Sequence, residues 1–220
     1  MIFQEQPLAL RNATPIAKGG NRLVFPHPTN PDWLIKVMKP EVASGRYGEG
    51  GTWFRRNRRY GHYILFMREI REYVAACASH GGSAPFVHKI TGLVDTDLGL
   101  GLVMEAARDA EGNLAPTAAK LIFEGRYDDR AAAALERFLA DILESNVVFA
   151  DLHERNIVYA RGKDGEDRFI MIDGLGSSTF LPFKMWIRAI NLRSKRKRIE
   201  RLRKRIAGRL AAYRAGNPIP

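Results

Sequence analysis

The 220 residues of the chain are 45% hydrophobic and 27% charged, as expected for one globular domain or two small lobes with a sizeable apolar core. Its single cysteine, Cys77, excludes an internal disulfide, and no apolar run approaches the ~18 residues of a membrane span. The N-terminus has no basic segment followed by a long apolar run, so we expect no signal peptide and a cytoplasmic protein.

The net charge of +11 is concentrated near the C-terminus. Residues 184–220 hold 13 of the 35 Lys and Arg residues and one acid, Glu200. The rest of the chain is therefore close to neutral, and the basic character says more about the tail than about the fold.

The first part of the chain predicts strands. Residues 14–25, "TPIAKGGNRLVF", are typical of two strands around a glycine turn, and residues 33–40, "WLIKVMKP", predict a third strand that ends at Pro40. Residues 43–61 are rich in Gly and Arg and lack a clean period, which indicates a loop or an insertion.

A helix and two more strands follow. Residues 63–78 repeat apolar side chains at helical spacing, and residues 86–106 predict two strands around the turn "DTDLG". The segment "DAEGNLAPT", residues 109–117, consists of turn residues and indicates a linker. Up to this linker, the prediction is five strands with one inserted helix.

Helices dominate the remainder. Residues 128–146 predict a helix capped by Asp128 or Asp129, residues 156–174 predict a hairpin with the turn "KDGED", and basic helical sequence follows to about Tyr213. Because strands and helices occur in groups and do not alternate, the predicted fold class is α+β.

Polar side chains gather around "FADLHERNIVYA", residues 149–160, between a predicted helix and a predicted strand. Asp151 and Asn156 lie five positions apart there, and a loop between two packed elements can aim both side chains at one cavity. A carboxylate can accept a proton from a hydroxyl nucleophile, and an amide oxygen suits Mg²⁺. Asp173, after the apolar strand residues "FIMI", offers a further oxygen ligand. Each residue taken alone also fits a turn or a cap.

Lys36 is a lone charge among the apolar residues of "WLIKVM". A buried ammonium needs a partner, and Glu69 and Glu72 on the next helix share one face. We favour Glu69, against the alternatives of an edge strand with Lys36 facing water and a solvated helix face. Gly19 and Gly20 can bring backbone N–H groups close to phosphate oxygens, although a Gly-Gly hairpin without a ligand is at least as common.

These signals occur in the order that protein-kinase-like phosphotransferases use: glycine turn, strand lysine, helix glutamate, D-x-x-x-x-N loop, and a strand followed by Asp-Gly. "VMEAA", residues 103–107, resembles the hinge of that fold, with an ordinary core strand as the alternative. The chain also resembles the bacterial YrbL family, which is associated by name with the PhoP regulatory network. Five segments carry this resemblance, from about Pro15 to the basic tail: "GGNRLVFPHPTNPDWLIKV", "REIREY", "DAEGNLAPT", "FADLHERNIVY" and "IDGLGSSTFLPFKMW".

The resemblance implies a kinase-like fold and a role for each candidate residue. Asp151 would be the catalytic base, and Lys36 would hold the α- and β-phosphates of ATP and pair with Glu69. Asn156 and Asp173 would hold Mg²⁺. Other contacts to the nucleotide would come from Gly19, Gly20, Glu105 and Ala107.

Departures from protein kinases bear on the substrate. Ala150 stands where many protein kinases have Arg, and His153 where Ser/Thr kinases usually have Lys. "D-L-H-x-x-N" is closer to aminoglycoside and choline phosphotransferases, which act on small molecules. Only 47 residues follow Asp173, too few for the usual platform for a protein substrate. The substrate is then small, a partner completes the lobe, or the catalytic role is lost.

The basic tail has an apolar stripe, because Leu192, Ile199, Leu202, Ile206 and Leu210 are spaced 7, 3, 4 and 4 residues apart. We favour docking of this stripe on the protein's own C-lobe. The alternatives are a helix on anionic lipid, with Trp186 at the interface, and a helix that binds RNA phosphates. No RNA-binding motif of known type is visible, so specific nucleic-acid recognition is not expected.

The resulting prediction is a minimal two-lobed kinase-like fold. Residues 1–107 form the N-lobe, residues 108–183 a reduced C-lobe with the catalytic loop, and residues 184–220 a basic amphipathic helix. We expect an ATP- and Mg²⁺-dependent phosphotransferase that acts on a small molecule, on a lipid or sugar headgroup, or on itself. The alternatives are a nucleotide-binding regulatory pseudokinase without turnover, and a basic adaptor that binds membrane, RNA or an acidic partner through its C-terminal helix, which would make the protein peripheral to the inner membrane.

Overall fold

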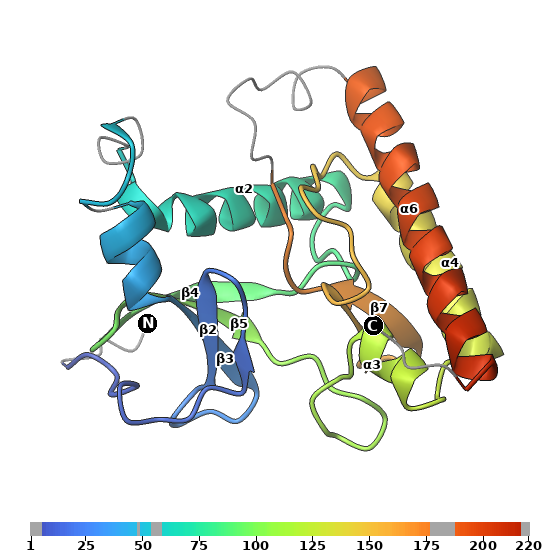
Figure 1. Ribbon diagram of the computed structural model, residues 1–220, viewed down its shortest axis with the longest axis horizontal. Coiled ribbons are helices and arrows are strands. Elements are labelled where there is room, and N and C mark those ends of the chain that lie inside the picture. The colour runs from blue at the N-terminus through green and yellow to red at the C-terminus, as the bar shows by residue number, and fades with distance from the viewer. Residues whose placement is uncertain (1–5, 48, 54–58, 177–187, 217–220) are drawn as a thin grey trace. The chain divides into compact units, whose positions relative to one another are not determined.

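The computed structural model describes residues 6–47, 49–53, 59–176 and 188–216 (Figure 1). Its contacts divide the chain into two compact units. The first unit is Met1–Met67 with Lys89–Ala106, and the second is Arg68–His88 with Ala107–Pro220. Residues 68–88, which the sequence analysis grouped with the N-lobe, therefore belong to the second unit, as does the basic C-terminal helix.

The first unit contains a five-stranded antiparallel sheet in the order β1-β2-β3-β5-β4. Its apolar core includes Phe25, Ile35, Val37 and Val103. Lys36 lies in the central strand and pairs with Val24 on one side and Leu102 on the other. The strands are β1 (Ala17–Lys18), β2 (Arg22–Pro26), β3 (Trp33–Met38), β4 (Ile90–Thr96) and β5 (Gly99–Glu105), as Figure 1 shows for most of them.

The described part of the Gly- and Arg-rich segment, which was expected to be a loop, includes helical turns. Val42–Arg46 forms a π-helix, η1, and Gly61–Tyr63 forms a 3-10 turn, η2. Helix α2 (Ile64–Ser79) follows directly, at the predicted position, and from Arg68 onward it belongs to the second unit.

The second unit is built on α4 (Asp129–Glu144), which buries one apolar face. The cap is Asp128, since its Oδ1 accepts a hydrogen bond from Ala131 N at 2.9 Å. The hairpin of β6 (Ile157–Arg161) and β7 (Asp167–Met171) has the predicted position. A short helix, α3 (Ala118–Phe123), was not predicted, because six residues hold fewer than two turns of apolar periodicity. The element order confirms the predicted α+β fold class.

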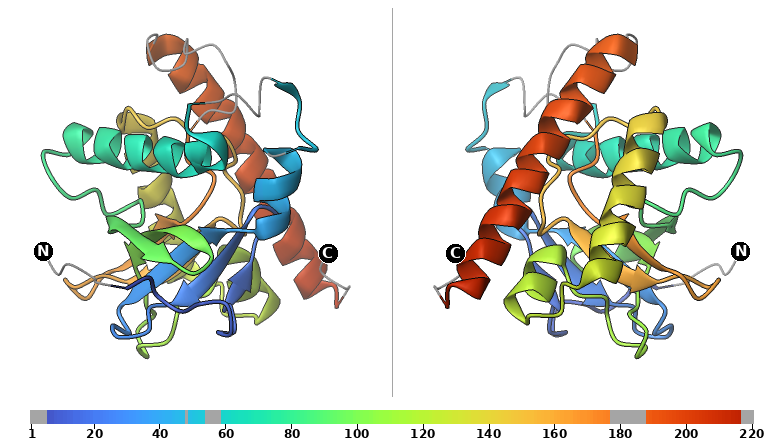
Figure 2. Two further views of the ribbon diagram at one scale, coloured as in Figure 1. Left: turned by 90° about the vertical axis from the view of Figure 1, so that its left-hand side faces the viewer. Right: turned by 90° about the vertical axis from the view of Figure 1, so that its right-hand side faces the viewer.

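Helix α6 (Arg188–Arg214) packs against α3 and α4 in the second unit (Figure 2). Ile199, Leu202 and Ile206 are buried in the apolar core of that unit, and Leu210 packs against it. Docking of the tail within the chain is therefore confirmed. Trp186, proposed for a lipid interface, lies outside the described residues. Among the helices that the structure describes, none is long and apolar enough to cross a membrane.

A buried lysine joins α6 to the C-terminal end of α4. Lys195 is 2% exposed, and its Nζ donates to Ile142 O at 2.7 Å and to Ser145 O at 2.5 Å. A hydrogen-bond donor is needed there, because the last carbonyl groups of a helix lack partners within it. Burial, reinforced by Arg188, lowers the pKa of Lys195 from 10.5 to about 8, and Glu72 opposes this shift.

This lowered pKa predicts a dependence of stability on pH. Between pH 8 and 10.5 the unfolded chain binds more protons than the folded chain, so the free energy of unfolding rises with pH in this range. The stabilisation by neutral Lys195 is complete above pH 10.5 and is lost as the pH falls through 8. We compare the free energies of unfolding of the wild type and of Lys195→Met. Their difference, wild type minus variant, should grow by roughly 3 kcal/mol as the pH rises from 8 to 10.5. Urea unfolding at several pH values measures the difference. Lys197→Met, an exposed change on the same helix, is the control, and a difference that stays constant with pH would contradict the prediction.

Candidate active site

Two segments of the second unit carry three of the predicted site residues, and hydrogen bonds join them. Ala150 N and Asp151 N both donate to Gly174 O, at 2.8 Å and 3.2 Å. Ile172 N donates to Asn156 O at 2.9 Å. The loop that carries Asp151 and Asn156 therefore lies against the segment that carries Asp173.

The side chains in this region present oxygen atoms. Asn156 Nδ2 donates to Asp151 O at 3.1 Å and to Asp151 Oδ2 at 3.2 Å. This assignment of the amide follows from its hydrogen bonds and leaves Asn156 Oδ1 as an acceptor. Asp173 Oδ1 accepts a hydrogen bond from Gly174 N at 2.6 Å. A neutral amide oxygen with one carboxylate fits Mg²⁺, which takes its other ligands from water and phosphate.

The described residues contain no cluster of three or more His, Cys, Asp or Glu side chains that could hold a metal ion. A site made of Asn156 and Asp173 alone would thus be completed by water and by the ligand. That is the usual way in which proteins bind Mg²⁺ together with a nucleotide.

Gly174 allows the two segments to approach closely. Its φ is +83°, and a Cβ at this position would lie 2.3 Å from Asp151 O. Any side chain would separate the loop from the segment after β7. This accounts for glycine directly after Asp173.

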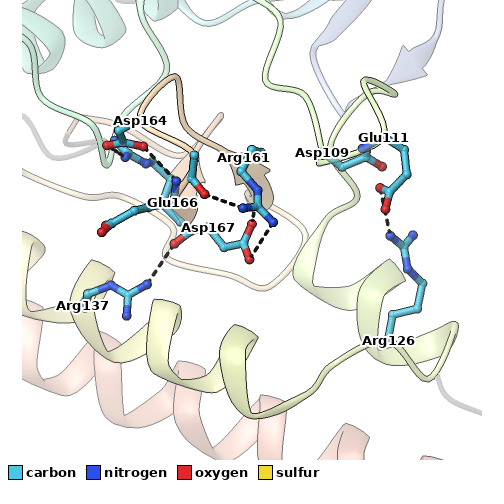
Figure 3. Close-up of polar contacts among 10 residues, drawn as sticks. Asp109, Glu111, Arg126, Arg137, Arg161, Asp164, Glu166 and Asp167 are labelled. Carbon is cyan, nitrogen blue, oxygen red and sulfur yellow. Dashed lines mark hydrogen bonds and ion pairs between the residues drawn. The ribbon is translucent and has the colours of Figure 1, made fainter.

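The β6–β7 hairpin fixes the positions of Asn156 and Asp173, which flank its open end. Ile157 pairs with Met171 at that end. Near the turn, Arg161 Nε lies 2.8 Å from Asp167 Oδ1, and Arg137 of α4 donates to Asp167 O at 3.0 Å (Figure 3). Asn156 and Asp173 therefore adjoin a hairpin whose position is stabilised by these contacts.

Helix α6 reaches the same loop through Arg198. Its Nη1 donates to the carbonyl oxygen of Ala150, the residue before Asp151. Burial and the charge of Arg201 lower the pKa of Arg198, and the charge of Asp151 opposes this. Arg198 was not among the residues predicted from the sequence, and its position beside Ile199 of the apolar stripe was the available signal.

Lys36 is 4% exposed in the central strand of the first unit, so the alternative of a water-facing edge strand is wrong. Glu69 lies in the second unit, where its Oε1 is 2.9 Å from His88 Nε2. His88 Nδ1 is 3.1 Å from Met171 O, and the pair thus links α2 to β7. His88 was not predicted as a site residue from the sequence. The pairing of Lys36 with Glu69 would join the two units and stays a prediction.

Glu72 supports the beginning of the loop that carries Asp151. Its Oε2 accepts a hydrogen bond from Val148 N at 2.8 Å. Its Oε1 lies 3.3 Å from Arg71 Nη2. Burial raises the pKa of Glu72, and its hydrogen bond with Val148 counteracts the shift. Glu72 thus stabilises the chain just before Asp151.

The glycine turn leaves space for a ligand. Neither Gly19 nor Gly20 has a positive φ, and a Cβ on Gly20 would meet no atom within 4 Å. The fold of this turn therefore does not itself demand glycine at position 20. A backbone without a side chain there is suited to close approach by phosphate.

The hinge-like segment is partly occupied by internal hydrogen bonds. Glu105 N donates to Lys89 O at 2.9 Å, and Ala106 N donates to Asp32 O at 2.7 Å. Ala107 O accepts from Ala115 N at 2.9 Å, whereas the N–H of Ala107 donates to none of the residues described by the structure. The roles of Glu105 and Ala107 towards adenine stay predictions.

The chain matches the model of one protein family and is similar to two curated proteins. A model of the family described as "PhoP regulatory network protein YrbL" matches residues 8–207. Two curated relatives, each named "Uncharacterized protein YrbL", come from Escherichia coli (strain K12) and Shigella flexneri. Each is 26% identical over 205 residues, which is 90% of this chain and 85% of the relative.

Among solved structures, a crystal structure of the Mycobacterium tuberculosis PknI kinase domain is similar with a TM-score of 0.45 and 16% identity. The match covers 73% of this chain and 56% of that chain.

Proposed function

The chain belongs to the YrbL family of PhoP regulatory network proteins, and from this premise we propose that it is an ATP- and Mg²⁺-dependent phosphotransferase. One observation carries the proposal. Asp151, Asn156 and Asp173 come from two segments that hydrogen bonds hold side by side. A base next to two hard oxygen ligands is the arrangement that phosphoryl transfer requires.

In the proposed reaction, the hydroxyl oxygen of the acceptor forms a bond to the γ-phosphorus of ATP. The bond between the γ-phosphorus and the β-phosphate oxygen breaks, and ADP leaves. Asp151, whose side chain is solvent-exposed and can meet an acceptor, takes the hydroxyl proton. Asn156 and Asp173 would hold Mg²⁺, which supplies neutralisation of the phosphate charges.

A small molecule or a headgroup is the proposed acceptor. In the second unit, α6 is the helix described after Asp173, and it packs on α3 and α4. The segment "D-L-H-x-x-N", residues 151–156, resembles the corresponding loop of phosphotransferases that act on small molecules, and this supports a small acceptor. Autophosphorylation is a second route for the same chemistry.

Nucleotide binding tests the proposal. We expect Mg²⁺–ATP to raise the Tm of the wild type by roughly 5–10 °C at a concentration of about 100 Kd, because ligand binding stabilises the folded state. Asp173→Ala should remove this shift, since it deletes the only carboxylate of the proposed metal pair. Thermal unfolding with and without nucleotide measures both effects.

Asp129→Ala is the matched control, because it removes an exposed carboxylate in the first turn of α4. It should retain the full shift. A wild type with no shift at millimolar Mg²⁺–ATP would contradict both the phosphotransferase and the nucleotide-binding alternative.

A further inference from the structure

A basic pocket adjoins the loop that carries Asp151. It has a volume of about 430 Å³ and lies within the second unit, between the catalytic loop and one face of α6. Its lining consists of His153, Glu154, Lys204, Arg205, Gly208, Arg209 and Ala212. His153 is two residues from Asp151 in the chain, so the pocket begins next to the proposed base.

Small residues on α6 make the hollow. The helix contributes positions 204, 205, 208, 209 and 212, a spacing that places them on one side. Gly208 and Ala212 have little or no side chain, and a Cβ on Gly208 would meet no atom within 4 Å. A glycine in a helix interior costs stability relative to alanine, and its presence here keeps the space open.

A buried carboxylate orients one of the cations. Glu154 is 1% exposed, and its Oε1 lies 2.8 Å from Arg209 Nε. Its Oε2 lies 3.0 Å from His153 Nδ1. The contact uses the Nε–H of Arg209, and its two Nη groups make no hydrogen bond or ion pair with the residues in the described part of the chain. These planar donors are thus held in place and remain available to an oxyanion.

The pocket has an excess of positive charge. Lys204 and Arg205 are exposed, and neither forms a hydrogen bond or ion pair with another described residue. The three Lys and Arg side chains of the lining and the single carboxylate of Glu154 together carry two net positive charges. A phosphomonoester carries about −1.5 to −2 charges at pH 7, which matches this excess.

We propose that this pocket binds a phosphomonoester group that the acceptor already carries. The inference rests on the proposed function, which gives the acceptor hydroxyl its place at Asp151. The substrate class is then a phosphorylated alcohol, and its phosphate is held by Arg209, Lys204 and Arg205 while its hydroxyl reaches the base. An open hollow of this volume fits a small molecule or one lipid headgroup.

Direct binding of glycerol 3-phosphate, with glycerol as the uncharged counterpart and without ATP, tests the pocket by calorimetry. The double variant Lys204→Gln/Arg205→Gln should raise the Kd for glycerol 3-phosphate by about tenfold or more, because two charged contacts are lost. Arg196→Gln/Lys197→Gln is the matched control. It removes the same charge from exposed positions of the same helix and should leave the Kd unchanged.

A second variant separates a pocket from diffuse charge. Gly208→Leu retains every cation and fills the hollow, so it should also weaken binding of glycerol 3-phosphate. The proposal is overturned by equal effects of the two double variants, by unchanged binding in Gly208→Leu, or by a wild type that does not bind at millimolar concentration. Circular dichroism establishes that each variant is folded.

Two further arms identify the source of the phosphate and separate this inference from the proposed function. Pocket-dependent binding to phosphatidylcholine vesicles that contain phosphatidic acid indicates a lipid headgroup, and binding of glycerol 3-phosphate alone indicates a soluble acceptor. If glycerol 3-phosphate binds through Lys204 and Arg205 while Mg²⁺–ATP gives no Tm shift, the phosphotransferase fails and the anion site stands. If the Tm shift occurs without glycerol 3-phosphate binding, the pocket proposal alone fails.

Discussion

Asp151→Asn is expected to lower ATP turnover by about 10²–10⁴-fold and to leave nucleotide binding intact. Asparagine has nearly the shape of aspartate, and its side-chain oxygen can still accept the hydrogen bond that Asn156 Nδ2 donates at 3.2 Å. It cannot take a proton from the acceptor hydroxyl. The loss therefore falls on the chemical step and not on the fold or on the metal ligands.

Two measurements separate these effects. Conversion of radiolabelled ATP to ADP gives the turnover, and the Tm shift with Mg²⁺–ATP gives binding. Asp129→Asn, an exposed change of the same chemistry on α4, is the control and should retain full turnover. A wild type that binds Mg²⁺–ATP but turns over no faster than Asp151→Asn would contradict the phosphotransferase and favour the regulatory module without turnover.

Part of the fold was predictable, because local patterns determine it. The stripe of Ile199, Leu202 and Ile206 has a helical period, and such a stripe needs an apolar surface whatever the surrounding charge. The short Asp151 to Asn156 spacing keeps both residues in one loop wherever that loop packs. Its contact with the segment after β7 depended on the α4–β6–β7 order, which the sequence also indicated.

Other parts of the site were not predictable, since they depend on contacts between distant residues. Glu69 and His88 meet across 19 positions, and neither has a local signal for the other. The basic tail shows the same limit. The sequence alone does not show that Lys195 is buried at the end of α4, that Arg198 binds the loop before Asp151, or that other cations of the tail line the pocket.

These separate roles connect the tail to the proposed chemistry. Arg198 donates to the carbonyl oxygen of Ala150, directly before Asp151. Arg209 binds the carboxylate of Glu154, three residues after Asp151. Both contacts need α6 to be docked. The loop geometry should therefore depend on the apolar stripe, although no residue of that stripe lies at the candidate site.

Leu202→Asp should destabilise the second unit by about 4 kcal/mol or more. Leu202 is fully buried in the core of that unit, and the change removes its apolar contacts and buries a carboxylate. For a chain of this size the loss corresponds to a Tm lower by roughly 8–16 °C. Thermal unfolding measures it, and ATP turnover should fall with the undocking of α6 from the catalytic loop.

Ala207→Asp is the matched control, because it adds the same charge at an exposed position of α6 five residues further on. It should change the Tm little, as surface substitutions usually do. Equal Tm values for the two variants would mean that the stripe is not buried in solution, and α6 would then be free to bind a membrane or RNA through its apolar and basic faces. A large difference assigns the stripe to the core and leaves only the exposed cations of α6 for an external ligand.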